Sequence, residues 1–448
     1  MDCHAPVCPK CLVRTEVGTK CQSCAAPAEV RVTRVPRSKK PLAAVVGGAA
    51  VVVAIVVALV VTQGGGSSNP TAALPPVGHW TSESPLGSIR GTAAVVTLAN
   101  GTVLAAGGGV GQLPVASTEI FSTTTAKWSP TGQLNVPRRG ASAVVLADGR
   151  VLVTGGISGP QILASSEVYD PATGKWALVG SMSTPRLDNT LTLLPSGKVL
   201  AAGGTTQSGT AGTGAGQTII PVASAELFDP ATGRWTPTGS MSAARFEASG
   251  TSLADGRVLV AGGLGGAGTP GANGLTYPPL TSAEIYDPAV GAFTGAGRMA
   301  TARAYQVAAR LSDGTVIVAG GAGGADGLTT LGGAERFDPA NGSWRTLTSM
   351  TSPRTGAAAT TLKNGDVLVA GGESGDQGST SSLASAEVYQ PAKGVWRSAG
   401  KMPCARSGLG AAGLSDGSVL EVAGDTAFPG QPPVAQGCVD RYYPSSTG

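Results

Sequence analysis

Few of the residue types that carry enzymatic chemistry are present in this chain. Its 448 residues include two histidines, His4 and His79, while charged residues make up 13% and aromatic residues 4% of the total. A catalytic triad would have to draw its general base from these two imidazoles. A glycine-rich phosphate loop between a strand and a helix is also missing. The composition therefore disfavours triad hydrolases and phosphate-loop enzymes.

Charge is scarce outside the N-terminal segment. Residues 1–40 hold eight Lys and Arg against three Asp and Glu, which leaves 23 basic and 24 acidic residues in the rest of the chain. A segment that is nearly neutral has no electrostatic footprint for nucleic acid. We therefore expect no nucleic-acid partner.

What the chain has instead is a repeat of about fifty residues. In six places a Tyr or Phe is followed seven residues later by a second ring, with an acidic residue nine before that ring and an Arg ten after it. The aromatic pairs are Phe121/Trp128, Tyr169/Trp176, Phe228/Trp235, Tyr286/Phe293, Phe337/Trp344 and Tyr389/Trp396. The arginines are Arg90, Arg138, Arg186, Arg245, Arg303, Arg354 and Arg406, and the acidic residues are Glu119, Glu167, Glu226, Glu284, Glu335, Glu387 and Asp440. We expect these Arg and acidic positions to be structural, because a ligand rarely uses seven equivalent positions.

The two ends of the repeat region complement each other. Tyr442 has no ring seven residues later because the sequence given ends at Gly448, and Trp80 has no aromatic partner before it. A repeat split in this way indicates a ring in which the N-terminal strand completes the last unit. The sequence therefore predicts seven units that close on themselves.

Each unit reads as four strands. A stretch rich in Ala, Val and Thr is followed by a tight-turn pair such as Asp148-Gly149, a buried run such as Val151–Gly156, and the two aromatic segments. Small residues early in the unit and rings late in it suit a wedge-shaped blade, narrow at an axis and wide at the rim. The predicted fold is an all-β, seven-bladed β-propeller of four-stranded blades.

The Gly-Gly pair, followed by an aromatic residue and then by a Trp with six residues between the two rings, resembles the kelch repeat. The DPATG and DGRVLVAGG sequences are similar to its bacterial, galactose-oxidase-like branch. The resemblance covers residues 78–448. It implies a propeller that serves either as a binding module or as an enzyme. Copper sites of the galactose-oxidase type need histidine ligands, and we expect neither His4 in the tail nor His79 in the closing strand to reach the propeller mouth. No copper is therefore expected.

An uncharged run over residues 42–62, dominated by Val, Ala and Leu, predicts one transmembrane helix. Residues 29–41 form a basic flank, and residues 63–77 a Gly/Ser/Pro linker. The positive-inside rule then places the N-terminus in the cytoplasm and the propeller outside the cell membrane. A cleaved signal peptide is the alternative. The length of the run and the absence of an A-x-A site argue against it.

Residues 1–28 resemble a small zinc ribbon because they contain two C-x-x-C pairs. Four thiolates can hold one structural Zn²⁺ in a tetrahedron. The predicted ligands are Cys8, Cys11, Cys21 and Cys24. An unstructured thiol-bearing tail is the alternative, and His4 with Cys8 and Cys11 also resembles the motif of zinc-binding anti-sigma domains. Whether Cys3 or His4 joins the metal stays open.

Two further cysteines belong to the last blade. Cys404 precedes Arg406 by two residues, and Cys438 precedes Asp440 by two. Both enter connections that open on the same propeller face, on the oxidising side of the membrane. We predict a disulfide between them, with two buried thiols as the alternative.

The repeat departs from its own pattern in blades 3 to 5. The position two residues after the repeat Arg is Thr or Gly in the other four blades, whereas here it is Asp188, Glu247 and Tyr305, with Asn189 and Gln306 alongside. The connections before the acidic position are also about twice as long in blades 3 and 4 as in blades 1 and 2. Carboxylates, a phenol and amides at a channel mouth can bind a polar ligand. The plainer interpretation is that they only fill and hydrate the channel.

These features predict a membrane-anchored propeller that binds or scaffolds a glycan or a protein. A carbohydrate-active enzyme of the sugar mutarotase or epimerase kind is the rival, with Asp188 or Glu247 as its acid or base. A third hypothesis is transmembrane signalling, in which the zinc-binding tail meets a cytoplasmic protein partner.

Overall fold

A computed structural model describes residues 12–15, 18–21, 76–208, 218–266, 268–271, 274–324, 327, 329–375, 380–427 and 433–445. The chain divides into two compact units, Met1–Asn69 and Pro70–Gly448. In the first unit, β1 (Leu12–Thr15) and β2 (Gly18–Cys21) form an antiparallel hairpin. The predicted helix at 42–62, its basic flank, most of the linker, and Cys8, Cys11 and Cys24 lie outside the described residues. Within those residues no helix is long and apolar enough to cross a membrane.

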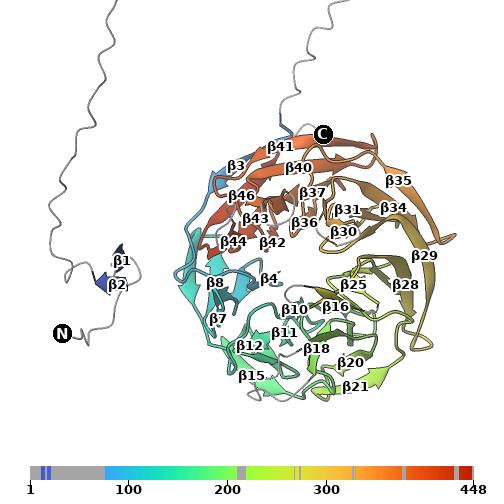
Figure 1. The fold of residues 1–448 in the computed structure, drawn as a ribbon, viewed down its shortest axis with the longest axis horizontal. Coiled ribbons are helices and arrows are strands. Elements are labelled where there is room, and N and C mark those ends of the chain that lie inside the picture. The colour runs from blue at the N-terminus through green and yellow to red at the C-terminus, as the bar shows by residue number, and fades with distance from the viewer. Residues whose placement is uncertain are drawn as a thin grey trace, which may run out of the picture. The chain divides into compact units, whose positions relative to one another are not determined.

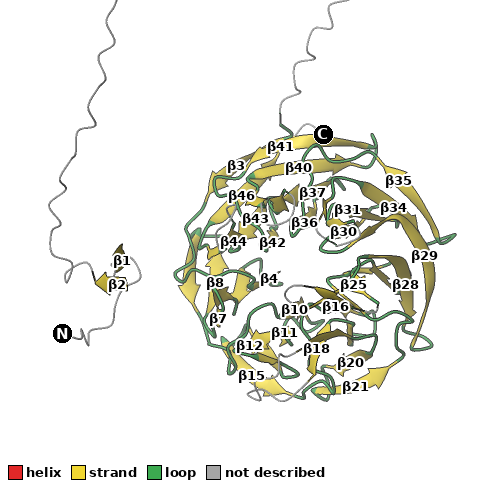
Figure 2. Ribbon diagram, viewed as in Figure 1, coloured by secondary structure: helices red, strands yellow, loops and turns green. Residues whose placement is uncertain are grey.

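The second unit is an all-β propeller of seven four-stranded antiparallel blades, as the repeat predicts (Figures 1 and 2). In each blade we call the strands a to d, from the channel outwards. Blades 1 to 3 are β4 (Ala94–Thr97), β5 (Val103–Ala106), β8 (Thr118–Ser122), β9 (Lys127–Pro130); β10 (Ser142–Val145), β11 (Val151–Thr154), β14 (Ser166–Asp170), β15 (Lys175–Val179); β16 (Thr190–Leu193), β17 (Val199–Ala202), β20 (Ala225–Asp229), β21 (Arg234–Thr238). Blades 4 to 6 are β23 (Ser249–Ser252), β24 (Val258–Ala261), β28 (Leu280–Asp287), β29 (Ala292–Arg303); β30 (Val307–Arg310), β31 (Val316–Ala319), β34 (Ala334–Asp338), β35 (Ser343–Leu347); β36 (Ala358–Thr361), β37 (Val367–Ala370), β40 (Ser385–Gln390), β41 (Val395–Lys401). Blade 7 is β42 (Gly410–Gly413), β43 (Val419–Val422), β46 (Val439–Pro444) and β3 (Gly78–Ser82).

Blade 7 confirms the predicted closure by the N-terminal strand. β3 is its outer strand and pairs with β46, so that Trp80 stands directly opposite Tyr442 with the ring centroids 5.0 Å apart. The Trp80 indole Nε1 donates to the carbonyl of Ala399 in blade 6 at 2.8 Å. The first described strand of the propeller therefore ties blade 7 to blade 6 as well as completing its sheet.

The core lies between successive blades. The a strands β4, β10, β16, β23, β30, β36 and β42 contact one another in a closed ring around the channel. The b strands are buried along their whole length because neighbouring blades cover both of their faces. In one such layer, Val151 and Tyr169 of blade 2 pack against Leu104 of blade 1.

The repeat Arg and acidic residues form buried ion pairs inside each blade, which confirms that these positions are structural. In blade 2, Arg138 Nη2 lies 2.9 Å from Glu167 Oε1, and Arg138 Nη1 donates to the carbonyls of Gly155 and Ser165. Glu167 in turn accepts the backbone N–H groups of Asn135 and Val136. Each guanidinium and carboxylate thereby stabilises the connection between two blades.

The connections between strands b and c rise on one face of the propeller as small hairpins, which we call the crown. Its members are β6 (Gly109–Val110) with β7 (Leu113–Pro114), β12 (Ile157–Ser158) with β13 (Gln161–Ile162), β18 (Thr205–Ser208) with β19 (Thr218–Pro221), β26 (Thr269–Gly271) with β27 (Gly274–Thr276), β32 (Ala322–Gly323) with β33 (Thr329–Thr330), β38 (Glu373–Ser374) with β39 (Ser381–Ser382), and β44 (Asp425–Thr426) with β45 (Val434–Ala435). A further pair, β22 (Arg245–Phe246) with β25 (Leu264–Gly265), joins the start of blade 4 to its crown. The long connections of blades 3 and 4 therefore contain β-hairpins, which their Gly- and Thr-rich sequences did not predict.

Candidate functional site

The site is built on one backbone position that recurs in all seven blades, two residues after the repeat Arg. Its φ is positive every time, from 48° at Thr92 to 62° at Gly140. Neighbouring positions are joined by backbone hydrogen bonds, such as Glu247 N to Asp188 O (3.2 Å) and Tyr305 N to Glu247 O (3.1 Å). These residues lie at the channel mouth on the crown face.

Glycine is the residue that suits this position, because left-handed backbone costs other residues roughly 1–2 kcal/mol each. Three blades have Gly here and blade 1 has Thr92, whereas Asp188, Glu247 and Tyr305 of blades 3 to 5 adopt φ values of 57°, 51° and 56°. Three consecutive strained side chains are therefore present where the backbone geometry favours none. Strain of this kind collects at functional sites.

The carboxyl groups of Asp188 and Glu247 hydrogen-bond to each other. Burial raises the pKa of Asp188 to about 6, although the bond with Glu247 and the positive charge of Arg139 act to lower it. Burial, followed by the charge of Asp188, raises the pKa of Glu247 well above its usual range. Both shifts favour a shared proton in the pair, so that one carboxyl group can donate a hydrogen bond to the other.

Tyr305 stands beside this acid pair and forms one wall of a cavity of about 300 Å³. Its side chain is 38% exposed. Burial and the charges of Glu247 and Asp188 raise its pKa, so the phenol stays neutral and can donate a hydrogen bond. Glu373 and Ser407 also line it, and Glu373 Oε1 accepts the Ser407 hydroxyl at 2.5 Å. The cavity thus has an aromatic side chain and polar groups in its lining, next to the acid pair and not including it.

The structure brings Asp188, Glu247 and Tyr305 together but turns Asn189 and Gln306 into the framework. The Asn189 amide donates to the carbonyl of Thr190, and the Gln306 amide donates to the carbonyl of Ala261 in the preceding blade. Both side chains are at least nine-tenths buried. The Gln306 amide thereby links blade 5 to blade 4, whereas the Asn189 amide makes a local contact in blade 3.

Four polar residues near the mouth were not predicted from the sequence: Arg139, Glu373, Ser407 and Asp425. Arg139, whose Nη2 donates to Gln112 at 2.5 Å, acts electrostatically on both Asp188 and Asp425. Burial raises the pKa of Asp425, with Arg139 opposing and Glu373 adding to the shift. These residues and Ser407 follow either the repeat Arg or the Gly-Gly pair, two positions that vary from blade to blade. That variability was the signal available in the sequence.

Blade 7 departs from the others on the same face. Cys404 and Cys438 form a disulfide with their Cα atoms 6.4 Å apart. Cys438 occupies the position at which five other blades have a Ser whose hydroxyl accepts from the repeat Arg, as Ser165 does from Arg138. The disulfide thus replaces a hydrogen bond with a covalent link in the blade that closes the ring.

Comparison with known proteins supports the repeat and the fold. The Kelch motif matches residues 138–183, 303–351 and 353–403. The chain therefore carries kelch repeats and folds as a seven-bladed kelch-type propeller. No curated protein matches it significantly.

Among solved structures, the propeller is similar to a "novel fungal alcohol oxidase with catalytic diversity among the AA5 family, in complex with copper". The TM-score is 0.62 and the identity 20%, over 82% of this chain and 76% of the other. At that identity the likeness shows the fold.

The residues at the mouth do not fit a copper centre with histidine ligands. His79 is the one histidine among the described residues, and it lies in the outermost strand of blade 7, stacked on Tyr443 at 5.1 Å. No group of three or more His, Cys, Asp or Glu side chains in the described part of the chain is placed to hold a metal ion. The chemistry available at the mouth is that of carboxyl, phenol, guanidinium and hydroxyl groups.

Proposed function

We propose that the propeller is a recognition module that binds a hydroxyl-rich ligand, a glycan, at the channel mouth. One observation carries the proposal: Asp188, Glu247 and Tyr305 occupy, in consecutive blades, a backbone position whose geometry favours glycine. Folding gains nothing from side chains there that glycine would not supply at lower cost.

The chemistry of the mouth suits sugar hydroxyls, which both donate and accept hydrogen bonds. Within the acid pair one carboxyl group can accept while its protonated partner donates, and the Tyr305 phenol can donate as well. The exposed Tyr305 ring offers an apolar face on which the C–H face of a pyranose can lie. A cavity of about 300 Å³ is at the lower end of the range for small-ligand sites.

A glycan array probed with the full-length protein tests this proposal. The double variant Asp188→Asn/Glu247→Gln should bind its best glycan roughly tenfold or more weakly, since each amide has one acceptor oxygen where the carboxyl group has two and carries no charge. Asp148→Asn, an exposed turn acid on the opposite face, is the matched control and should bind like the parent. Equal glycan binding by the double variant would reject the mouth as the site.

A protein ligand is the alternative occupant of the crown face. Leu113 on β7 is 72% exposed, and Ile219 on β19 and Val434 on β45 are exposed as well. A pull-down with the parent and with Leu113→Ser would separate the two ligands. Loss of a captured protein with unchanged glycan binding would favour the protein.

A sugar mutarotase or epimerase is the second candidate, favoured by the separated pKa values of the acid pair. In mutarotation, Asp188 would remove the anomeric O–H proton while Glu247 protonates the ring oxygen. The ring C–O bond then breaks as the carbonyl forms, and reclosure reverses the two transfers. NMR exchange between sugar anomers detects this activity. Faster exchange with the parent but not with the double variant would favour the enzyme.

We also propose that residues 42–62 anchor the chain in the cell membrane and that the N-terminal cysteines bind Zn²⁺ in the cytoplasm. The two C-x-x-C pairs of the sequence support the metal site, because they can supply four thiolates. Zinc content of the full-length protein, measured by mass spectrometry, should be one ion per chain and fall with Cys8→Ser/Cys21→Ser. If the tail signals, the same change should alter capture of a cytoplasmic partner.

A further inference from the structure

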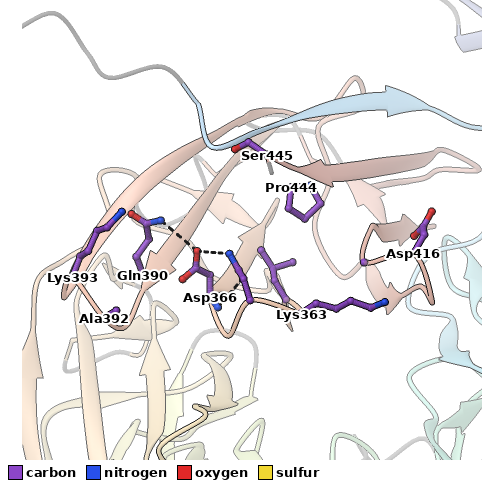
Figure 3. A pocket seen from close by; sticks show the side chains of 11 residues that line it. Lys363, Asp366, Gln390, Ala392, Lys393, Asp416, Pro444 and Ser445 are labelled. Carbon is purple, nitrogen blue, oxygen red and sulfur yellow. Dashed lines mark hydrogen bonds between the residues drawn. The ribbon is translucent and has the colours of Figure 1, made fainter. Parts of the chain in front are cut away.

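A second cavity, of about 580 Å³, lies between blades 6 and 7 on the face opposite to the crown (Figure 3). The a–b turns of both blades, the c–d turn of blade 6 and the end of β46 line it. None of these residues takes part in the mouth site. The cavity therefore needs an explanation of its own.

The c–d turn of blade 6 differs from its counterparts at two residues that face this cavity. In blade 2 the turn reads DPATG, and Asp170 closes it by accepting from the N–H of Ala172 (2.9 Å) and the hydroxyl of Thr173 (3.0 Å). In blade 6 it reads QPAKG, with Gln390 in place of the Asp and Lys393 in place of the Thr. Both new side chains line the cavity instead of closing the turn.

Gln390 presents an unsatisfied acceptor. Its side chain is 4% exposed, and its Nε2 donates to Asp366 Oδ2 at 3.3 Å. Because Asp366 can only accept, this bond fixes the orientation of the amide. The buried Gln390 Oε1 then has no hydrogen-bond partner in the described part of the chain. Such an atom calls for a donor that a ligand can supply.

The charges around the cavity favour an anion. Lys363 donates to the carbonyl of Ser415, and neither Lys363 nor Lys393 forms an ion pair with a carboxylate of the described residues. Of the nearby acids, Asp416 is paired with Arg441, whereas Asp366 accepts from the neutral amides of Asn364 and Gln390, so two lysines stand against one carboxylate that has no ion-pair partner in the described residues. In the view of Figure 3, Lys393 and Lys363 lie on either side of Asp366.

We infer that this cavity binds a hydroxylated organic anion, such as a sugar acid or a sugar phosphate. Its carboxylate or phosphate meets Lys363 and Lys393, and one of its hydroxyls donates to Gln390 Oε1. The volume falls within the range of small-ligand sites. This ligand is independent of the one proposed for the channel mouth.

Titration calorimetry of the full-length protein with glucuronate, glucose 6-phosphate and glucose tests the inference. The parent should bind at least one anion, and roughly tenfold more tightly than glucose. Lys393→Thr restores the residue that blades 2 and 3 have at this position of the turn, so it should keep the parent's melting temperature and lose most of the anion affinity. Asp188→Asn/Glu247→Gln should bind the anions as the parent does.

Binding of glucuronate alone would identify a carboxylate site, and of glucose 6-phosphate alone a phosphate site. The inference fails if the parent binds neither anion at millimolar concentration, if glucose binds equally well, or if the folded turn variant retains full affinity. Any of these results would leave the mouth proposal standing, because its residues are separate.

Discussion

Glu421 is an acid buried in the b strand of blade 7, and we predict that it makes the stability of the propeller depend on pH. It stands directly opposite Asp440, at a position that is Val or Ala in every other blade. Neither of its carboxyl oxygens has a hydrogen-bond partner among the described residues. Burial raises its pKa to about 8, with Arg406 opposing and Asp440 adding to the shift.

The sign follows from the raised pKa. Folding favours the protonated acid, so its contribution is fully present below the unfolded pKa of 4.5 and is lost as the pH rises towards 8. Each pH unit in that window costs up to about 1.4 kcal/mol. Between pH 5 and pH 7 the parent should therefore lose roughly 2–3 kcal/mol of unfolding free energy on account of Glu421.

Urea unfolding of the parent and of Glu421→Gln at pH 5, 6 and 7 measures this term. Asp188 and Glu247 titrate in both proteins, so their contribution cancels in the difference. The variant should be close to the parent at pH 5 and more stable by about 2–3 kcal/mol at pH 7. Parallel pH profiles would refute the burial of an uncompensated carboxyl group. Glu421→Val, which restores the repeat, should behave like the Gln variant.

Three further predictions concern the closure and the mouth. A chain that begins after Trp80 lacks the outer strand of blade 7 and should melt lower and self-associate in sedimentation experiments; melting like the parent would contradict the closure. Cys404→Ser/Cys438→Ser opens a loop of 34 residues and should lower the unfolding free energy by about 3–4 kcal/mol, which an equal effect of dithiothreitol on the parent would corroborate. Glu247→Gly relieves the left-handed strain and should raise the unfolding free energy by about 1 kcal/mol while weakening ligand binding; a destabilised variant would show that Glu247 serves the fold.

The repeat made the fold predictable because each blade restates the same constraints. Tyr442 without a following ring and Trp80 without a preceding one determined the closure, which the β3–β46 pairing confirms. The ion pairs could be predicted equally well, since a buried Arg needs an acidic partner and the two recur at the same places in every blade.

The residues of the channel mouth could be predicted only in part, because the closure of the ring determines which residues lie close together there. Arg139 of blade 2 and Asp425 of blade 7 lie far apart in sequence, and neither position repeats a residue type. Side-chain direction was a second limit. Gln306 follows Tyr305 directly, yet its amide donates to Ala261 of the preceding blade while the phenol stays at the mouth.

The positions at which the chain departs from its repeat fall into two groups, according to whether another interaction in the fold makes up for the stability that the departure costs. Cys438 replaces a Ser and loses its hydrogen bond to the repeat Arg, but the disulfide compensates for it within the fold. Asp188, Glu247 and Gln390 have no such compensation in the described residues: the first two occupy strained backbone, and the third buries an unsatisfied carbonyl. In a repeat protein each such residue can be compared with the residue at the same position of another blade, where the strain or the unsatisfied atom is absent. Departures that cost stability without local compensation and that border a cavity, unlike the fully buried Glu421, are therefore the positions at which ligand contact should be sought first, ahead of the larger but structurally satisfied set of seven arginines.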